Sequence, residues 1–329
     1  MLAALLAAAL AALYSHWAAS TRAAGLQPSD LLQLTGWGGS GARAAEWSYL
    51  RPPPGAAKEQ EALARLAGPS AWHRMRDDKG ALLFPECAGA AQSPIDLPVD
   101  HPPAGAAAGA AGAAAVPRAL DLSLPAAPLR LASQHTGFGG AVYYPLQESN
   151  VTWRLGDEQL HLLQFHFHSW SEHTLGGRAL AMELHLVFFR HGEASPRAVL
   201  GILYGAAPAP NAALEGLWAH LHRSEHHAHG NKLPVAGLLH LHALLADTQQ
   251  RYYRYAGSLT TPPCSEGVDW HVLVSSVGVS EAQRAAFAES LPGPDALNYR
   301  EVQPLGGRRV EVLDKSQDHF IEEIQAAAA

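Results

Sequence analysis

The sequence predicts a single, mainly β domain of about 270 residues, a size that β architectures reach without dividing into separate domains. Hydrophobic residues make up 48% of the 329 positions and charged residues only 16%, so the chain can bury a large core. No repeat period runs along it, which argues against solenoids and propellers. Short runs that alternate between apolar and polar side chains, as half-buried strands do, recur at Gln159–His168, Ala181–Phe188, Ala198–Tyr204 and Val268–Val274.

Helical signals are fewer and shorter than the strand signals. Ala212–Arg223 follows Pro210, and Glu281–Ser290 follows Ser280, a residue type that caps helix N-termini. We therefore expect a few short helices at the periphery of the strands.

Both ends of the chain and one internal stretch fall outside this pattern. Residues 1–13 are apolar without a break, long enough for the core of a signal peptide but too short to span a bilayer. No Lys or Arg precedes them, so a fraying Ala-rich helix is the alternative. We assign residues 1–25 to a signal or targeting segment, 45–320 to the domain and 321–329 to a C-terminal tail. An Ala/Gly-rich surface insertion is expected at 103–117.

The charge balance narrows the class of partner. The 30 acidic and 23 basic residues give a net charge of -7, and the four lysines form no cluster that could follow a phosphate backbone, which argues against nucleic acid. Beyond the N-terminus no stretch reaches about 18 apolar residues, so no membrane span is expected in the mature chain. The 19 histidines point instead to metal binding or to proton transfer near neutral pH. The sequence predicts no particular oligomeric state.

The densest chemical signal is QFHFH at Gln164–His168. Alternate side chains of a strand share a face, so His166 and His168 project from one side and aim two imidazoles at one point. His185 lies in another alternating run, AMELHLVF, with Glu183 on the same face. Three imidazoles suit a catalytic zinc site that keeps a fourth position open for water. The alternative is a set of ordinary core or surface histidines in a His-rich chain.

The motifs around these histidines resemble those of the α-class carbonic anhydrases. The similarity rests on QFHFH together with QSPID at Gln92–Asp96, SEH at Ser171–His173, ELHLV at Glu183–Val187 and YAGSLTTPPCSEGVDW at Tyr255–Trp270. In the order of the family, WSY at Trp47–Tyr49 precedes them and NYREVQPL at Asn298–Leu305 follows them. The resemblance implies a large twisted, mostly antiparallel central sheet with zinc at the base of a conical cleft.

The resemblance also assigns a cofactor and its ligands. It implies that Zn2+ is held by His166, His168 and His185. Metal-bound histidines need partners that fix their tautomer and ring orientation. The residues that resemble those partners are Gln164, Glu183 and Asn298.

Two further groups of residues resemble the parts that handle substrate. Glu172 and Thr260 would orient a zinc-bound hydroxide, because a threonine that gives its proton to a buried carboxylate must accept a hydrogen bond from the nucleophile. A substrate as nonpolar as CO2 needs a largely apolar pocket beside the metal. The residues that resemble that pocket are Val187, Val199, Leu259, Thr261, Val268 and Trp270.

Cysteines and prolines resemble further features of the family. Cys87 and Cys264 resemble the disulfide of the secreted and lumenal members, with two free thiols as the alternative. Ser93–Pro94 and Pro262–Pro263 resemble its cis peptide bonds. With the apolar N-terminus and the glycosylation sequon at Asn150, the cysteine pair favours an extracytoplasmic location, either secreted, in a periplasmic space or in an organelle lumen.

Proton transfer is where the sequence departs from the family. Its faster members carry a histidine directly after a glycine on the cleft wall, whereas here that position holds Phe138, which has no group that titrates. We therefore expect slow proton export unless His135 or Tyr49 compensates. A separate histidine cluster is either a solvated loop or a further metal or relay site, and consists of His226, His227 and His229.

The resemblance implies a lyase, carbonate dehydratase, that hydrates CO2 reversibly to bicarbonate and a proton through zinc-bound hydroxide. A non-catalytic, carbonic-anhydrase-like binding domain is the alternative, and hydrolysis of activated esters is a related side activity. The sequence retains all three ligand positions together with Glu172 and Thr260, which favours the enzyme. The partners it implies are the small molecules CO2 and bicarbonate.

Overall fold

The computed structural model describes residues 49, 68–77, 79–99, 120–125, 129–135, 140–145, 151–191, 193, 195–219, 221, 232–239, 241, 245, 251–291, 297–314 and 320–324. Strands predominate among these residues, as the sequence predicts. The shorter or earlier strands are β1 (Asp96–Leu97), β2 (Asp121–Ser123), β3 (Leu129–His135), β4 (Ala141–Pro145), β5 (Thr152–Leu155), β7 (Thr174–Leu175) and β8 (Arg178–Ala179). The others are β6 (Glu158–His168), β9 (Met182–Arg190), β10 (Pro196–Ala207), β11 (Lys232–Leu239), β12 (Arg251–Ser258), β13 (Glu266–Leu273), β14 (Val277–Ser280), β15 (Val310–Asp314) and β16 (Phe320–Ile324).

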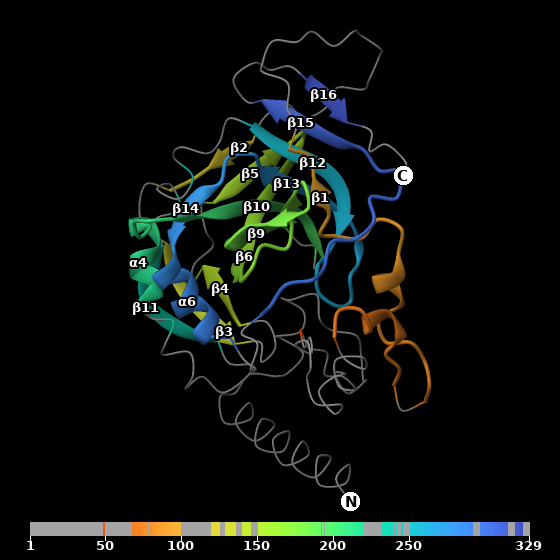
Figure 1. Cartoon of the computed structure of the whole chain (residues 1–329), viewed down its shortest axis with the longest axis horizontal. Helices are drawn as coiled ribbons and strands as arrows, with labels where there is room; N and C mark the ends of the chain where they lie inside the picture. Colours follow the sequence, from red (N-terminus) through yellow and green to blue (C-terminus); the bar gives the residue numbers. More distant parts are fainter. Residues whose placement is uncertain are drawn as a thin grey trace, which may run out of the picture.

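One large sheet organises the described part of the chain. It contains thirteen strands, ten of which follow the order β11-β3-β4-β6-β9-β10-β13-β12-β15-β16, with β2, β5 and β14 attached at the side. Most neighbours in it are antiparallel, but β10 runs parallel to both β13 and β14. A small second sheet has the order β1-β7-β8. Figure 1 shows the large sheet curling through the centre of the molecule, with the histidine-bearing strands β6 and β9 in its middle.

Two short α-helices, α4 (Ala212–Trp218) and α6 (Glu281–Glu289), lie together on one flank of the sheet (Figure 1). Helix α6 begins with the predicted cap, because Ser280 and Gln283 form a reciprocal capping box. Gln283 also joins the helices: its side-chain oxygen accepts a 2.7 Å hydrogen bond from the amide of Asn211, the N-cap of α4. Helix α4 ends at Trp218, earlier than the pattern over Ala212–Arg223 predicts, and the low helix propensity of glycine near its centre is consistent with this length. Two 3-10 turns, η1 (Trp72–Arg74) and η2 (Pro85–Ala88), precede the sheet.

A register shift in β6 sets which residues face the site. The ladder to β9 pairs Leu162 with Phe188 and then Gln164 with Val187, so β6 contains one extra residue at this point. The side chains that enter the main core therefore change from Leu160 and Leu162 before the shift to Phe165 and Phe167 after it. The sequence predicts uninterrupted alternation over Gln159–His168, and this prediction is wrong by one residue. The two adjacent leucines at 162 and 163 are the sequence signal for the extra residue.

The two faces of the central strands enter different cores. On β9, Leu184, Leu186 and Phe188 pack in the larger cluster, and Val187 packs in a second cluster on the opposite face. On β10, Leu200 and Ile202 likewise join the larger cluster, and Val199 joins the second. This alternation is what the sequence predicts for these two strands.

The C-terminal end differs from the expected tail at 321–329. Strand β16 occupies Phe320–Ile324 and pairs antiparallel with β15. Its two adjacent glutamates break the apolar and polar alternation, so the strand pairs through its backbone without a sequence pattern. Within the described residues, none of the helices has the length and apolar character needed to cross a membrane.

Candidate metal centre

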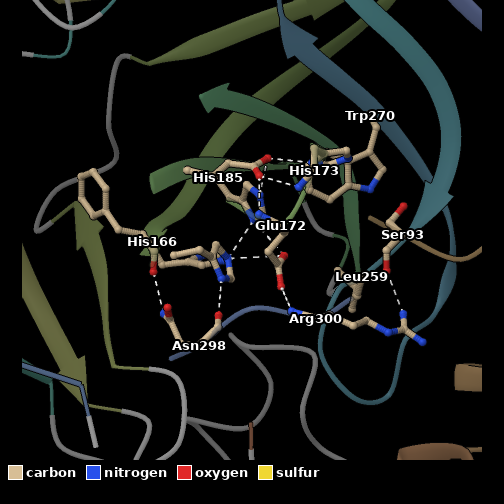
Figure 2. A network of polar contacts seen from close by, with 12 residues as sticks. Ser93, His166, Glu172, His173, His185, Leu259, Trp270, Asn298 and Arg300 are labelled. Carbon is tan, nitrogen blue, oxygen red and sulfur yellow. Dashed lines mark hydrogen bonds and ion pairs between the residues drawn. The ribbon is translucent and has the colours of Figure 1, made fainter. Parts of the chain in front are cut away.

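Adjacent strands bring the three predicted ligands together. His166 and His168 lie on β6 and His185 on β9, and His166 stands directly opposite His185 in the ladder. One nitrogen from each ring can be chosen so that all three lie within 4.8 Å of one another. His168 and His185 are buried and His166 is partly exposed. Figure 2 shows His166 and His185 turned toward a common point, where Glu172 also lies.

Hydrogen bonds behind the rings fix their tautomers. The contact distances are 2.9 Å from His166 Nδ1 to Gln164 Oε1, 2.5 Å from His168 Nδ1 to the backbone oxygen of Asn298, and 2.9 Å from His185 Nε2 to Glu183 Oε1. An amide, carbonyl or carboxylate oxygen only accepts, so each facing ring nitrogen carries the proton and donates it. In a neutral ring the second nitrogen then keeps its lone pair. These free lone pairs are on His166 Nε2, His168 Nε2 and His185 Nδ1.

The arrangement of lone pairs is that of a cation site. Burial and the neighbouring imidazoles hold the pKa of His166 well below its ordinary range and lower the pKa of His168 to about 3, so both rings are neutral near pH 7. His168 Nε2 and His185 Nδ1 nevertheless lie only 3.1 Å apart. Two facing lone pairs at this distance repel each other unless a cation binds both, and zinc to nitrogen bonds of about 2.0 Å are compatible with it. The residues present therefore fit a zinc ion.

Asn298 holds the end of β6 through its backbone oxygen and both polar atoms of its side chain. Its backbone oxygen accepts from His168, as described above, and its side-chain oxygen accepts a 2.8 Å hydrogen bond from the amide of Ser169. Its side-chain nitrogen donates to the carbonyl of Phe167, also at 2.8 Å. The family resemblance implies that Asn298 supports a ligand ring, and the structure shows that its backbone oxygen contacts His168 while its side chain fixes the strand end.

The carboxyl of Glu172 is buried beside the ligand rings. Its Oε2 lies 3.6 Å from His168 Nε2 and 3.9 Å from His185 Nδ1. Its Oε1 accepts a 2.7 Å hydrogen bond from the backbone amide of Arg300. Burial raises the pKa of Glu172 to about 7, while the electrostatic interaction with His185 and the hydrogen bonds from the Thr260 hydroxyl and the Arg300 amide lower it in part. The structure thus brings together Glu172 and Thr260, the pair named from the sequence.

A buried network behind Glu183 is not among the residues named from the sequence. Glu183 Oε1 accepts from His173 Nδ1 at 2.7 Å, and Glu183 Oε2 accepts from the amides of Glu172 and His173, both at 2.8 Å. His173 Nε2 lies 2.7 Å from the hydroxyl of Tyr255, which donates to Ser93 Oγ at 2.9 Å. The sequence signals for this network are the family motifs, because SEH contains His173, QSPID contains Ser93 and YAGSLTTPPCSEGVDW begins with Tyr255.

Three residues of this network, His173, Glu183 and His185, form a second group with the spacing of a metal site. Atoms of His173, Glu183 and His185 also lie within 4.8 Å of one another. Burial alone would raise the pKa of Glu183, but its electrostatic interactions and hydrogen bonds with His173 and His185 outweigh burial and hold this pKa well below its ordinary range. Because these atoms already bond to each other, the group orients His185 and offers no converging lone pairs.

Most of the predicted pocket residues form one row of small and aromatic side chains. Val187 on β9 pairs with Val199 on β10, which pairs with Trp270 on β13. These three and Val268 are buried in one cluster, with the partly buried Leu259 packed against it. The ring centroid of Trp270 lies 4.9 Å from that of His185, so the apolar row adjoins the histidines. Thr261 is partly buried, and its backbone oxygen accepts from the amide of Cys264 at 2.8 Å.

Gly201 makes room for the carboxylate in the neighbouring row. It stands opposite His185 in the ladder between β10 and β9. A Cβ atom at this position would lie 3.0 Å from Glu183 Oε1 and 3.2 Å from a methyl group of Val272. A larger residue would therefore displace the group that holds the His185 ring.

Cys87 and Cys264 form a disulfide, with Cα atoms 4.9 Å apart. Cys87 lies in η2, and Cys264 follows the loop that contains Thr260. Ser93–Pro94 and Pro262–Pro263 are both cis, as the family resemblance implies. A third cis bond, Ser169–Trp170, is not predicted from the sequence.

Comparison with known proteins matches this site and fold to one family. A sequence model of the eukaryotic-type carbonic anhydrases matches residues 67–313. The chain belongs to this family. A carbonic anhydrase of Nostoc sp. (strain PCC 7120 / SAG 25.82 / UTEX 2576) is 37% identical over 153 residues, 46% of this chain and 54% of that protein. A carbonic anhydrase of Klebsiella pneumoniae is 41% identical over 151 residues, 45% of this chain and 56% of that protein.

The matched segments therefore span little more than half the length of these curated carbonic anhydrases. A solved structure covers more of the fold. The α-carbonic anhydrase of Thermovibrio ammonificans, in complex with the inhibitor sulfanilamide, resembles this chain with a TM-score of 0.58 at 27% identity, over 82% of this chain and 99% of its own.

Two residues of this carbonic anhydrase family member, Tyr49 and His135, were named for proton transfer, and the structure describes Tyr49 and the backbone of His135. Tyr49 is buried against Trp72, with ring centroids 5.8 Å apart. His135 is the last residue of β3, where its backbone pairs with Ala141. The other sequence predictions outside the described residues are segments 1–25 and 103–117 and the residues Phe138, Asn150, His226, His227 and His229.

Proposed function

We propose that this protein catalyses the reversible hydration of CO2 to bicarbonate and a proton at a zinc centre held by His166, His168 and His185. The observation that carries the proposal is the convergence of three imidazole lone pairs beside a buried carboxyl group and an apolar row of residues. Zinc bound there supplies a Lewis acid that ionises water near neutral pH, the established chemistry of this enzyme class.

The residues behind the rings keep the ligand nitrogens aimed. Oxygen atoms of Gln164, Asn298 and Glu183 each accept a hydrogen bond from the N–H group of one ring, so the rings cannot rotate or change tautomer without losing that bond. Glu183 is in turn held by His173 and by two backbone amides. Such support limits the entropy cost of assembling the three lone pairs for a metal.

Glu172 and Thr260 orient the attacking oxygen in this proposal. The carboxylate of Glu172 accepts a hydrogen bond from the Thr260 hydroxyl. The Oγ atom of Thr260 is then left to accept a hydrogen bond from the nucleophile. This arrangement favours a nucleophile or product that carries a proton on the oxygen nearest to Thr260. Val187, Val199 and Trp270 offer CO2 a surface without hydrogen-bonding groups on the side of the histidines.

Location and domain limits belong to the same proposal. The disulfide between Cys87 and Cys264 is compatible with an oxidising, extracytoplasmic compartment, where such bonds persist. We assign residues 45–324 to the catalytic domain, extending the sequence estimate so that it includes β16. CO2 and bicarbonate are the proposed partners, and proton export is expected to be slow unless His135 or Tyr49 compensates, because Phe138 cannot relay a proton.

The test is stopped-flow CO2 hydration on purified protein whose metal content is measured by atomic emission. About one equivalent of zinc is expected, since one site supplies three ligands. Thr260→Val keeps the shape of the side chain and removes its hydroxyl, so it should retain zinc and lose about 10²-fold in kcat/KM, the usual effect of removing one preorganised polar group. The matched control is Thr174→Val, the same change in β7, where the hydroxyl donates to Asp96 on the surface.

Two outcomes would contradict the proposal. Zinc-loaded protein without CO2 hydration would favour the non-catalytic binding domain. Equal activity of the parent and Thr260→Val would show that the hydroxyl does not orient the nucleophile.

A further inference from the structure

Arg300 is a buried cation whose side chain binds a single segment. It is 2% exposed and lies over the ring of Trp72, with 5.6 Å between guanidinium carbon and ring centroid. Nη1 donates to Gln92 Oε1 at 2.9 Å and to the carbonyl of Ser93 at 2.8 Å, and Nη2 donates to the carbonyl of Cys87 at 3.0 Å. The guanidinium therefore binds the segment from Cys87 to Ser93 at three acceptors, and Figure 2 shows the contact with Ser93.

The backbone of the same residue holds the carboxyl of the site. The Arg300 amide donates to Glu172 Oε1 at 2.7 Å, across 128 positions of sequence. The backbone position of residue 300 therefore sets where Glu172 Oε1 is held. Since the guanidinium anchors that backbone, the side chain of Arg300 acts on Glu172 through its own main chain.

Gln92 connects the Arg300 side chain to the loop that contains Thr260. Its side-chain nitrogen donates to the carbonyl of Cys264 at 3.1 Å, while its oxygen accepts from Arg300. Cys264 is bonded to Cys87 and donates its amide to the carbonyl of Thr261, next to Thr260. The two members of the orienting pair are thus tied to one guanidinium, Glu172 through an amide and Thr260 through Gln92 and the disulfide.

A purely structural role would not require an arginine here. Burying a cation costs several kcal/mol even when it is paired, and apolar side chains of similar volume often replace buried ions without loss of stability. Within the described residues, Arg300 Nε has no hydrogen-bond partner, so the guanidinium is buried with one of its donors unpaired. What arginine supplies that an apolar residue lacks is a rigid fork that reaches several acceptors at once.

We propose that Arg300 is a positioning residue that holds Glu172 and Thr260 in register for CO2 hydration. This rests on the proposed function. The side chain of Arg300 fixes the segment from Cys87 to Ser93 relative to the backbone at position 300, and this sets the distance between the carboxylate and the threonine loop. Lysine cannot replace it, because an ammonium group is a compact point charge without the fork.

The experiment is a double-mutant cycle on the zinc-loaded, disulfide-intact protein. Arg300→Lys should lower kcat/KM for CO2 about tenfold, the equivalent of one lost hydrogen bond of about 1.4 kcal/mol. In the Thr260→Val background the same change should cost less than about twofold, because residues that act through one group are not additive. The matched control is Arg308→Lys, since Arg308 donates to the carbonyls of Gln92 and Ala256 but makes none of the contacts to Glu172. Its effect should be below about twofold in either background.

Hydrogen exchange gives a readout that does not depend on activity. In a peptide covering positions 297–303, the amide at position 300 should exchange about tenfold faster in Arg300→Lys, without faster exchange in β9. Arg308→Lys should leave this amide protected. If Arg300→Lys does not fold, Gln92→Met removes one acceptor of Arg300 and the link to Cys264, and the same cycle applies.

The outcomes separate the two proposals. An active parent in which Arg300→Lys is fully additive with Thr260→Val, or in which the amide at 300 stays protected, overturns the role of Arg300 and leaves the proposed function standing. A zinc-loaded parent without CO2 hydration overturns the proposed function, and protection at position 300 then still decides whether Arg300 holds Glu172.

Discussion

Removing the disulfide is predicted to cost a large part of the free energy of unfolding. Cys87 and Cys264 are 177 positions apart in the sequence. Closing a loop of this length lowers the entropy of the unfolded chain, which corresponds to about 5 kcal/mol of stability at room temperature in the chain-entropy model. A folded domain is typically stable by about 5–15 kcal/mol, so Cys87→Ala with Cys264→Ala should leave the protein marginal.

The assay is urea unfolding at fixed zinc concentration for the oxidised parent, the reduced parent and the double alanine variant. Both cysteines also belong to a buried cluster with Tyr49 and Trp72, so the variant loses packing as well as the cross-link. The reduced parent keeps both sulfurs and isolates the effect of loop closure. It should account for most of the loss, with an increased m-value because the unfolded chain exposes more surface. A reduced parent destabilised by less than about 1 kcal/mol would refute the entropic argument.

Three further predictions concern the site. His185→Ala should abolish tight zinc binding, because two imidazoles are too few protein ligands, whereas His161→Ala on β6 should retain about one equivalent of zinc by atomic emission. Val199→Trp should keep zinc and block CO2 hydration by filling the apolar row, and undiminished turnover would show that Val199 does not line the substrate site. In metal-free protein, the pKa of Glu172 is raised from 4.5 to about 7, so the stability from this group is complete below pH 4.5 and is lost as pH rises through 7. The glutamine in Glu172→Gln cannot ionise, so the variant should lack about 3 kcal/mol of this decline in the free energy of unfolding. The measurement is urea unfolding with a chelator, at pH 4.5 and above pH 7. Parallel pH curves for parent and variant would contradict the shifted pKa.

On β9, which contains no bulge, the local sequence pattern was sufficient to predict which face of the strand each side chain occupies. Glu183, His185 and Val187 alternate with Leu184 and Leu186, and the structure separates them onto opposite faces of β9. Capping chemistry is equally local, so the start of α6 at Ser280 could be predicted from its own few residues. The disulfide and the two cis prolines came from the family resemblance, since neither spacing nor composition determines them.

Contacts between distant segments were beyond these patterns. The amide of Arg300 binds Glu172, and any residue type except proline offers the same donor, so the sequence carries no local sign of the contact. The parallel pairing of β10 with β13 is likewise a property of how the chain returns to the sheet. Strand β16 was missed because its sequence, FIEEI, lacks the alternation of apolar and polar residues from which the other strands were predicted.

The position of the histidines in the sheet bears on how freely the rest of the chain can vary in length. Strands β6 and β9 are interior, each hydrogen-bonded on both sides, and a slip of one residue would turn every side chain to the wrong face. Loops at the margins carry no such constraint, and lengthening a flexible loop costs little free energy. In the sequence, the Ala104–Ala115 stretch lies between β1 and β2 and precedes β6 and β9. Insertions, epitope tags or fused domains should therefore be tolerated there, whereas one residue added within β6 beyond its existing bulge would dismantle the centre.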